Sequence, residues 1–351
     1  MEPTQQTQDE ADRVDLVYQY VLAQIGAKTT SEVLALWQDV PAGQAAQTAS
    51  TWLARATTLI LTRRGQAKEL GIAYYRLARA LRTGTTVASP LIEEEEPDFV
   101  SLEMLRQEFE ALVAEQTGDG TTEVSAAPEP DGDDDSIELE RLDGFSESLE
   151  DDEAASQPYT ETLLEEMAEV ASNKVAAIPD DTPTGDAREA TKAMHVQHGA
   201  MIAAAGARTA MNGGRNATNQ ASARDPRVIG WVRQHGKSDN PCYFCSMLIS
   251  RRCLYKSAFT AGKGQRAEGL PPFLGDGLFK FHDNCHCTAE PVYSDAGIAT
   301  APKYAQNRKY AALWDKHIKG KFSGNDALNE WRKLLRRIRA NEEQTAAQEA
   351  A

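Results

Sequence analysis

The sequence predicts a mostly α-helical α+β fold, with an N-terminal helical bundle, an acidic disordered linker and a small C-terminal α+β module that carries a cluster of Cys and His. Three observations support this: apolar residues recur at helical spacing, acidic residues are concentrated in one segment, and all five cysteines lie between positions 242 and 287. We expect a helical docking unit over 1–88, a largely disordered acidic linker over 89–157, the cysteine-containing module over 158–295 and a basic amphipathic helical tail over 296–351.

The N-terminal region, residues 12–82, has the periodicity of amphipathic helices. Short connections such as Pro41–Gly43 suggest that these helices pack side by side in an antiparallel unit. The apolar positions that carry this prediction are Val14, Val17, Tyr20, Val21, Trp52, Leu53, Leu59, Ile60, Leu61, Leu70, Ala73, Tyr74, Leu77 and Leu81.

The segment that follows is strongly acidic. Between Glu93 and Glu153 there are 24 Asp and Glu residues against 2 Arg, set among Gly, Ser, Pro and Thr. Self-repulsion and few apolar residues predict a mostly disordered tether, or an acidic arm that docks on basic protein or keeps nucleic acid away. One helix is expected inside it, because Phe99, Leu102, Leu105 and Phe109 recur at helical spacing.

Residues 158–220 return to a helical pattern. An apolar stripe precedes Pro179, and a second helix is expected from Asp186 to the glycine pair Gly213–Gly214. On this second helix His195 and His198 are three positions apart on one face, a spacing that can hold a metal. Since no carboxylate or third histidine accompanies them, a structural role is the favoured interpretation.

The C-terminal part is basic and loop-rich. From Gly213 to Ala340 there are 22 Lys and Arg against 10 Asp and Glu. Short strands are expected at 228–232 and 278–281, and an amphipathic helix at 326–340. The basic residues of this helix are candidates for non-specific, salt-dependent contacts with DNA phosphates, although an ordinary solvated face explains them equally well. They are Arg332, Lys333, Arg336, Arg337 and Arg339.

The cysteines and one histidine form two short motifs with the spacing of metal ligands. Cys242-x-x-Cys245 is separated by 36 residues from His282-x-x-Cys285, and Cys287 competes for the fourth position. Two such pairs suit a tetrahedral structural zinc, because each spacing lets two side chains converge on one ion. Reduced cysteines in a small core, or a transient disulfide, are the alternatives.

Other chemistries find less support in the sequence. Cys253 follows Arg251–Arg252, which would make an exposed thiol more reactive, so a catalytic Cys253 with His235, His282 or His286 is the enzymatic alternative. The sequence contains no Gly-x-Ser-x-Gly elbow, Walker loop, dinucleotide-binding glycine pattern or His-Glu-x-x-His motif.

The N-terminus and the hydropathy indicate where the chain is made. The first residues are polar and acidic, unlike a secretory signal, and no stretch approaches the roughly 20 apolar residues that span a bilayer. We therefore expect synthesis in a cytosol-like compartment and no membrane partner. In that setting clustered Cys and His favour metal over disulfide.

Four segments together resemble a known phage family. The runs Ala207–Ala210, Val228–Trp231, Pro241–Leu248 and Phe281–Thr288 resemble the phage Mu F-like minor head proteins, with an Arg-Thr helix, a Trp-containing strand, C-x-x-C followed by Leu, and a His-x-x-Cys-x-Cys-Thr run. The resemblance covers roughly residues 190–293. Asp283 stands where the family usually has Pro and His286 where it usually has Arg, and the usual Gly after the Leu is missing, which suggests a branch similar to the minor capsid proteins of actinobacterial tailed phages.

The resemblance implies a structural protein of phage head morphogenesis inside the virion capsid. Its expected partners are the portal protein, the scaffold and the major capsid protein, with possible non-specific contact to packaged DNA. Proteins in this gene position are often labelled capsid maturation proteases, which is the enzymatic alternative. A third interpretation is a zinc-stapled, non-specific DNA-binding module.

Overall fold

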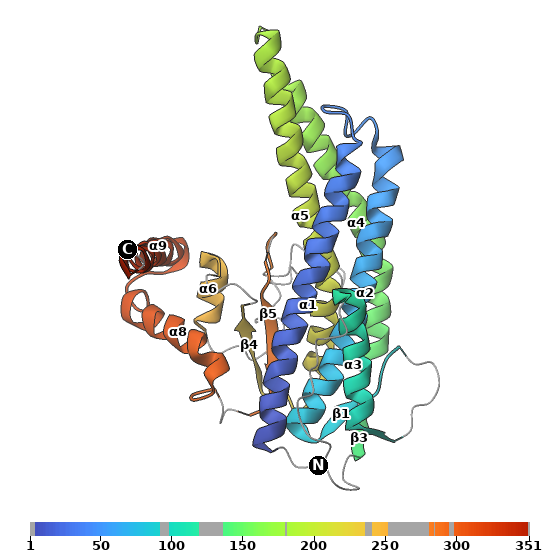
Figure 1. The fold of residues 1–351 in the computed structure, drawn as a ribbon, viewed down its shortest axis with the longest axis vertical. Helices are drawn as coiled ribbons and strands as arrows, with labels where there is room; N and C mark the ends of the chain where they lie inside the picture. Colours follow the sequence, from blue (N-terminus) through green and yellow to red (C-terminus); the bar gives the residue numbers. More distant parts are fainter. Residues whose placement is uncertain are drawn as a thin grey trace. The chain divides into compact units, whose positions relative to one another are not determined.

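A computed structural model describes residues 4–91, 98–118, 136–179, 181–235, 241–251, 281–283, 285–294 and 298–349. The chain forms two compact units. The first comprises Met1–Asp225 with Lys263–His286, and the second comprises Pro226–Gly262 with Cys287–Ala351. The described part is mostly helical with two small sheets, which confirms the predicted fold class of a helical bundle with a small C-terminal α+β region (Figure 1).

Long helices build the first unit. They are α1 (Gln5–Gln38), α2 (Ala49–Thr83), α4 (Phe145–Ala176) and α5 (Thr184–Arg224), joined by the shorter α3 (Leu102–Thr117) (Figure 1). Helix α1 begins at a capping box in which the Thr4 and Thr7 side chains each accept from the other's backbone N–H. Helix α2 ends at Gly84, whose φ of 76° is the left-handed conformation that glycine adopts without strain.

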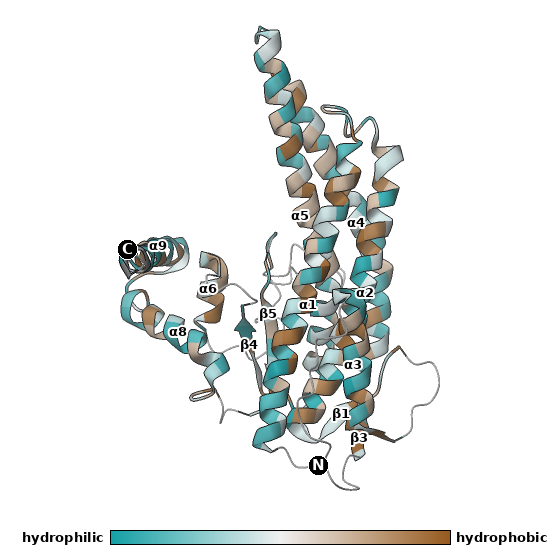
Figure 2. Cartoon of the chain, in the orientation of Figure 1, coloured by the Kyte–Doolittle hydropathy of each residue, from teal (hydrophilic) through white to brown (hydrophobic). Residues whose placement is uncertain are grey.

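Two apolar clusters hold the helices of this unit together. Apolar and polar residues alternate along each long helix (Figure 2), so every helix has a face that can be buried. One cluster joins α1, α2 and α3 around fully buried residues such as Leu70 and Phe109. The other joins α1, α2, α4 and α5 around Trp37, Trp52 and Ile60.

Glycines allow α2 and α5 to cross at backbone contact. A Cβ added to Gly71 of α2 would lie 2.6 Å from the carbonyl oxygen of Gly214, and one added to Gly213 would lie 2.1 Å from that of Arg64. The glycine pair on α5 was expected to end a helix near residue 213. Instead α5 continues to Arg224, because the pair lies where the neighbouring helix leaves no room for a side chain.

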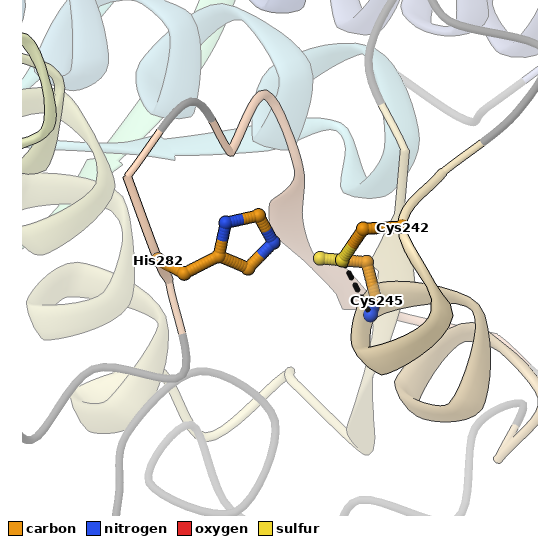
Figure 3. A group of neighbouring side chains, drawn as sticks. All are labelled: Cys242, Cys245 and His282. Carbon is orange, nitrogen blue, oxygen red and sulfur yellow. Dashed lines mark hydrogen bonds between the residues drawn. The ribbon is translucent and has the colours of Figure 1, made fainter. Parts of the chain in front are cut away.

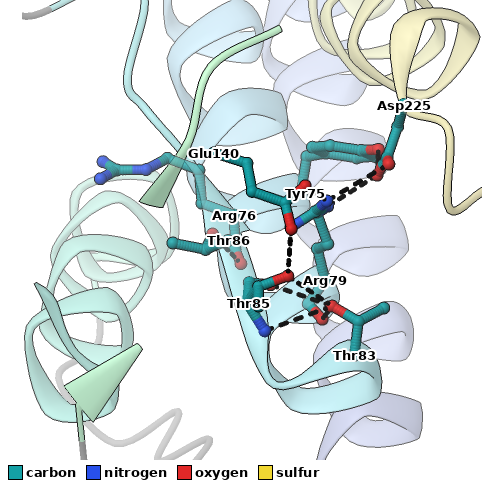
Figure 4. Close-up of polar contacts among 8 residues, drawn as sticks. All are labelled: Tyr75, Arg76, Arg79, Thr83, Thr85, Thr86, Glu140 and Asp225. Atoms are coloured by element: carbon teal, nitrogen blue, oxygen red, sulfur yellow. Dashed lines mark hydrogen bonds and ion pairs between the residues drawn. The ribbon is translucent and has the colours of Figure 1, made fainter. Parts of the chain in front are cut away.

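A small sheet and a buried ionic network close one end of the first unit. Strands β1 (Thr85–Val87) and β3 (Ser136–Glu140) are parallel, and β2 (Phe99–Ser101) pairs with β3 in antiparallel fashion. The guanidinium of Arg79 donates to Asp225 at 2.6 Å and also to Glu140, and the Tyr75 hydroxyl donates to Asp225 at 2.7 Å (Figure 4). Asp225 caps the end of α5, so the network ties this end to α2 and β3.

The prediction of a largely disordered linker over 89–157 is wrong for the stretches 98–118 and 136–157. These form β2, α3, β3 and the start of α4, and the helix expected around Phe109 is confirmed as α3. Apolar residues of the segment such as Leu105, Phe109 and Ile137 reach the core, and several of its acids pair with arginines of α2. The net charge of the segment reflects neither this burial nor these ion pairs. The remaining residues of the predicted linker that lie within 92–97 and 119–135 are outside the described residues.

The second unit is a small α+β fold. Strands β4 (Gly230–Gln234) and β5 (Thr288–Val292) form an antiparallel pair, in which the expected strand 228–232 is shifted by two residues. Helices α6 (Tyr243–Ile249), α8 (Ala305–His317) and α9 (Gly324–Glu349) pack around Trp331, which is fully buried. The indole N–H of Trp331 donates to the Ser246 hydroxyl at 3.1 Å. The other expected strand, 278–281, lies outside the described residues except for its last position.

The boundaries of the two units differ from those predicted at 157 and 295. Residues 158–225 belong to the first unit, and the expected separate tail over 296–351 belongs to the same unit as residues 226–262. Periodicity in the sequence identifies helices but not the surfaces on which they pack. The predicted boundaries therefore group helices that are neighbours in the sequence, whereas the structure groups helices that pack together. Among the described residues, no helix carries an apolar stretch long enough to cross a bilayer.

Candidate metal centre

The first pair of candidate ligands lies at the start of α6. Cys242 is the N-cap residue of this helix, and its sulfur accepts the backbone N–H of Cys245 at 3.3 Å. Such a bond from the backbone to sulfur stabilises a thiolate and holds the two side chains on the same side of the turn. Cys245 is buried and Cys242 is half-buried, so the pair faces the interior while one sulfur remains near the surface.

The second pair lies on a tight turn. The backbone N–H of Cys285 donates to the carbonyl oxygen of His282 at 3.0 Å, which brings these two residues close together. The Nδ1 of His282 lies 2.7 Å from the carbonyl oxygen of Asp283. Because a carbonyl oxygen only accepts, Nδ1 carries the proton, and Nε2 is left with a lone pair for a metal.

A buried arginine holds this turn in place. Arg215 of α5 donates to the carbonyl oxygen of Cys285, and its guanidinium lies 4.2 Å from the centre of the Phe281 ring. Both Arg215 and Phe281 are buried. The arginine therefore fixes the residue that precedes His282 as well as the backbone of a candidate ligand.

The candidate ligands converge in two overlapping groups. The ligand atoms of Cys242, Cys245 and His282 all lie within 4.8 Å of one another, and so do the sulfurs of Cys245, Cys285 and Cys287. Figure 3 shows the His282 ring directed toward the two sulfurs of the first pair. Since Cys245 belongs to both groups, all five residues gather around one location.

The geometry of the group fits zinc. In a tetrahedral site with Zn–S bonds of about 2.3 Å, the ligand atoms are about 3.8 Å apart. Separations within 4.8 Å therefore need only small side-chain adjustments to accept the ion. Thiolate and imidazole are also the donors that zinc prefers. The four described cysteines are free thiols, so the cluster can hold a metal ion such as zinc.

Among the described residues, His195 and His198 do not belong to the groups whose ligand atoms converge. His195 stacks on Trp37 with ring centres 4.9 Å apart, and burial there lowers its pKa. The Nδ1 of His198 donates to the carbonyl oxygen of Met194 at 2.7 Å. These contacts agree with the structural role predicted for the two histidines. Cys253, the nucleophile of the protease alternative, lies outside the described residues.

The basic residues of α9 divide into two groups. Arg332, Lys333, Arg336 and Arg337 are exposed, whereas Arg339 is half-buried. Arg339 donates to the carbonyl oxygen of Pro241 and lies 5.1 Å from the centre of the Tyr243 ring. It therefore supports the turn that carries the first cysteine pair. Arg336 also lies over the Tyr243 ring, at 5.6 Å, but it is exposed, so it and the other three remain candidates for an external partner.

Two arginines of the site were not identified by sequence reasoning. Arg215 holds the second turn, and Arg233 of β4 donates to the sulfur of Cys245 at 3.9 Å. Neither has a spacing signature relative to the cysteines. A weak signal exists for Arg233, since a charged residue within an otherwise strand-like run implies that its charge is used.

The comparisons with known proteins give one match. Residues 148–316, just under half of the chain, match the family model described as "VG15 protein". This range includes α5, the strand pair, α6 and the whole candidate metal centre. No curated protein and no solved structure matches the chain.

Proposed function

We propose that this chain is a structural protein of phage head assembly that binds one structural zinc ion through four of the five residues Cys242, Cys245, His282, Cys285 and Cys287. The observation that carries the zinc site is the convergence of their ligand atoms within 4.8 Å in two groups that share Cys245. Closed Cys and His sites of this kind contribute folding energy and leave no open position for a substrate. A structural role is therefore the best-supported one.

The role in head assembly rests on the resemblance to the phage Mu F-like minor head proteins. The segment that carries the resemblance, roughly residues 190–293, falls inside the range matched by the family model. In this proposal the chain is located inside the capsid. The helices of the first unit dock on the portal protein or scaffold, and the acidic segment, 24 Asp and Glu against 2 Arg between Glu93 and Glu153, faces basic partner surfaces near the major capsid protein.

The zinc site is tested by metal content and by removal of single thiols. Purified full chain should contain about one zinc per molecule. C245A should lose it, because Cys245 belongs to both groups of ligand atoms. C253A is the matched control and should keep the zinc. Equal zinc content in C245A and C253A would overturn the assignment.

The head-assembly role is tested by co-expression with the portal, scaffold and major capsid proteins of the same phage. Wild type and C253A should enter the particles, C245A should be depleted from them, and the masses of all the partners should stay unchanged. If metal-free, reduced protein keeps its fold and enters heads normally, the structural zinc is rejected. Defined cleavage of scaffold or capsid protein that C253A abolishes would identify a capsid maturation protease instead.

A second candidate function, non-specific DNA binding, is favoured by one observation. Arg332, Arg336 and Arg337 are exposed together on α9, so they are placed to meet phosphates. The triple variant R332Q/R336Q/R337Q should weaken DNA binding and flatten its dependence on salt. R13Q, which removes a charge from α1, is the control. Absence of DNA retardation by the wild type at about 50 mM salt would exclude this function.

A further inference from the structure

Arg233 occupies a buried position on the face of the strand pair that meets α6. It lies in β4, has 0% exposure and stands opposite Ala289 of β5. Trp231 and Ala289, which share this face, pack against Leu248 of α6. Because successive side chains of a strand alternate between faces, Arg233 also points toward the helix that carries Cys245.

The contact of this arginine with the thiol is direct. Its Nη2 donates to the sulfur of Cys245 at 3.9 Å, within the longer reach of hydrogen bonds to sulfur, and Cys245 is only 2% exposed. The backbone of the arginine is fixed as well, since the side-chain amide of Asn307 donates to its carbonyl oxygen at 2.9 Å. The guanidinium is therefore held against the sulfur by the strand.

The buried acid of the same strand pair serves another cation on the opposite face. Glu290 of β5 stands opposite Val232, so its side chain lies on the face away from α6. It accepts hydrogen bonds from Lys303 and from the Tyr304 hydroxyl, the latter at 2.9 Å. One face of the strand pair thus carries Glu290 with Lys303, and the other carries Arg233 with the thiol of Cys245.

A positive charge at this position matters because a cysteine-rich zinc site has excess negative charge. Zinc with three thiolates and one neutral histidine carries a net charge of −1, and with four thiolates −2. Burying such a net charge is costly unless an opposite charge lies nearby. Arginine supplies that charge at every physiological pH, since its guanidinium does not deprotonate in proteins.

We propose that Arg233 is a positioning residue of the metal centre, which orients Cys245 and offsets the excess negative charge of the thiolate ligands. This inference rests on the proposed zinc site and adds a determinant of its affinity. Partners in the outer shell of metal sites typically contribute about 10- to 100-fold to metal affinity. Removal of the Arg233 charge should therefore weaken zinc binding by about that factor.

The test compares four forms of the full chain: wild type, R233Q, R233K and R308Q. Arg308 is the matched control, because it belongs to the same unit and donates to the carbonyl oxygens of Ile298 and Ala301 rather than to sulfur. Zinc affinity is measured by competition with a chromophoric chelator. R233Q should bind about 10- to 100-fold more weakly, while R233K and R308Q stay within about threefold of wild type. Equal affinity of R233Q and R308Q would overturn the proposal.

A second readout separates an effect on the metal from a loss of packing. In cobalt-substituted protein, the thiolate-to-cobalt absorption band reports both the charge around the sulfurs and the hydrogen bonds that they accept. The band should move in R233Q, which loses both, and in R233K, which keeps the charge but loses the guanidinium that donates to Cys245. It should stay in place in R308Q. If R233Q does not fold, R233K carries the test, and an unchanged band in folded R233K would overturn the role of Arg233. Failure of the wild type to bind any metal would instead reject the zinc site itself.

Discussion

Alanine at Gly71 tests how closely α2 and α5 pack. A Cβ at this position would lie 2.6 Å from the carbonyl oxygen and 2.8 Å from the Cα of Gly214. Ordinary contact begins at 3.4 Å, so one backbone must move by about 0.8 Å (3.4 − 2.6). Both atoms belong to the backbone of a long helix, and no flexible side chain can absorb the shift.

Gly65 supplies a matched control on the same helix. A Cβ there has nothing within 4 Å. Both substitutions gain the roughly 1 kcal/mol by which alanine exceeds glycine in a helix. Only G71A adds an overpacking cost of about 1–3 kcal/mol. The difference between the two variants therefore isolates the cost of the helix crossing.

The measurement is urea unfolding of both variants and wild type, followed by circular dichroism at 222 nm. G65A should unfold at a higher urea concentration than wild type. G71A should unfold at a lower concentration than G65A, by about 0.5–1.5 M for a slope near 2 kcal/mol per molar urea. A midpoint for G71A equal to or above that of G65A would show that the helices tolerate a side chain at the crossing, which refutes the reasoning.

Three further substitutions probe polar contacts. D225N should lower the free energy of unfolding by about 3 kcal/mol, because it leaves the fully buried guanidinium of Arg79 with Glu140 as its one remaining charged partner among the described contacts; a loss below about 1 kcal/mol in urea would contradict this. Burial lowers the pKa of His195, so the unfolded chain binds more protons than the folded chain. The wild type should therefore lose stability as pH falls through and below about 6.5. H195Q should lose less stability than wild type between about pH 7 and pH 5, as measured by thermal melts of both proteins. R339A should lower the melting temperature of the second unit, whereas exposed R332A should leave it unchanged, since only Arg339 donates to the turn before the first cysteine pair.

The helices of the first unit could be predicted because their apolar positions follow a helical period. The sequence did not show how closely the backbones of these helices approach one another. The pair Gly213–Gly214 has the composition of a helix end, yet α5 continues through it, since the crossing with α2 needs residues without side chains. Local propensity and tertiary packing make opposite predictions for such a pair, and only the position of the neighbouring helix decides between them.

The acidic segment shows a similar limit. The net charge of the segment predicts a disordered chain. Net charge, however, does not show whether the apolar residues lie together on one face of a helix, and that arrangement decides whether the helix can be buried. In α3, Leu105, Phe109 and Val113 lie on one side and enter the core, while Glu108 pairs with Arg76 of α2. Part of the charge of this segment is offset by arginines of α2, the long helix that precedes it, as in the pair of Glu108 with Arg76.

In the candidate metal centre, local sequence motifs identify some of the residues but not others. The spacing of Cys242 with Cys245 and of His282 with Cys285 is local, so the candidate ligands could be named from the sequence, and the structure brings them together. The residues that hold them lie outside the two motifs: Arg215 comes from a long helix, 70 residues before Cys285, and Arg233 comes from a strand, 12 residues before Cys245. A buried arginine is invisible to spacing rules, because it is recognised only by the carbonyl or sulfur that accepts from it. Charge compensation is therefore the part of such a site that sequence motifs leave out, and it is the part most directly open to substitution.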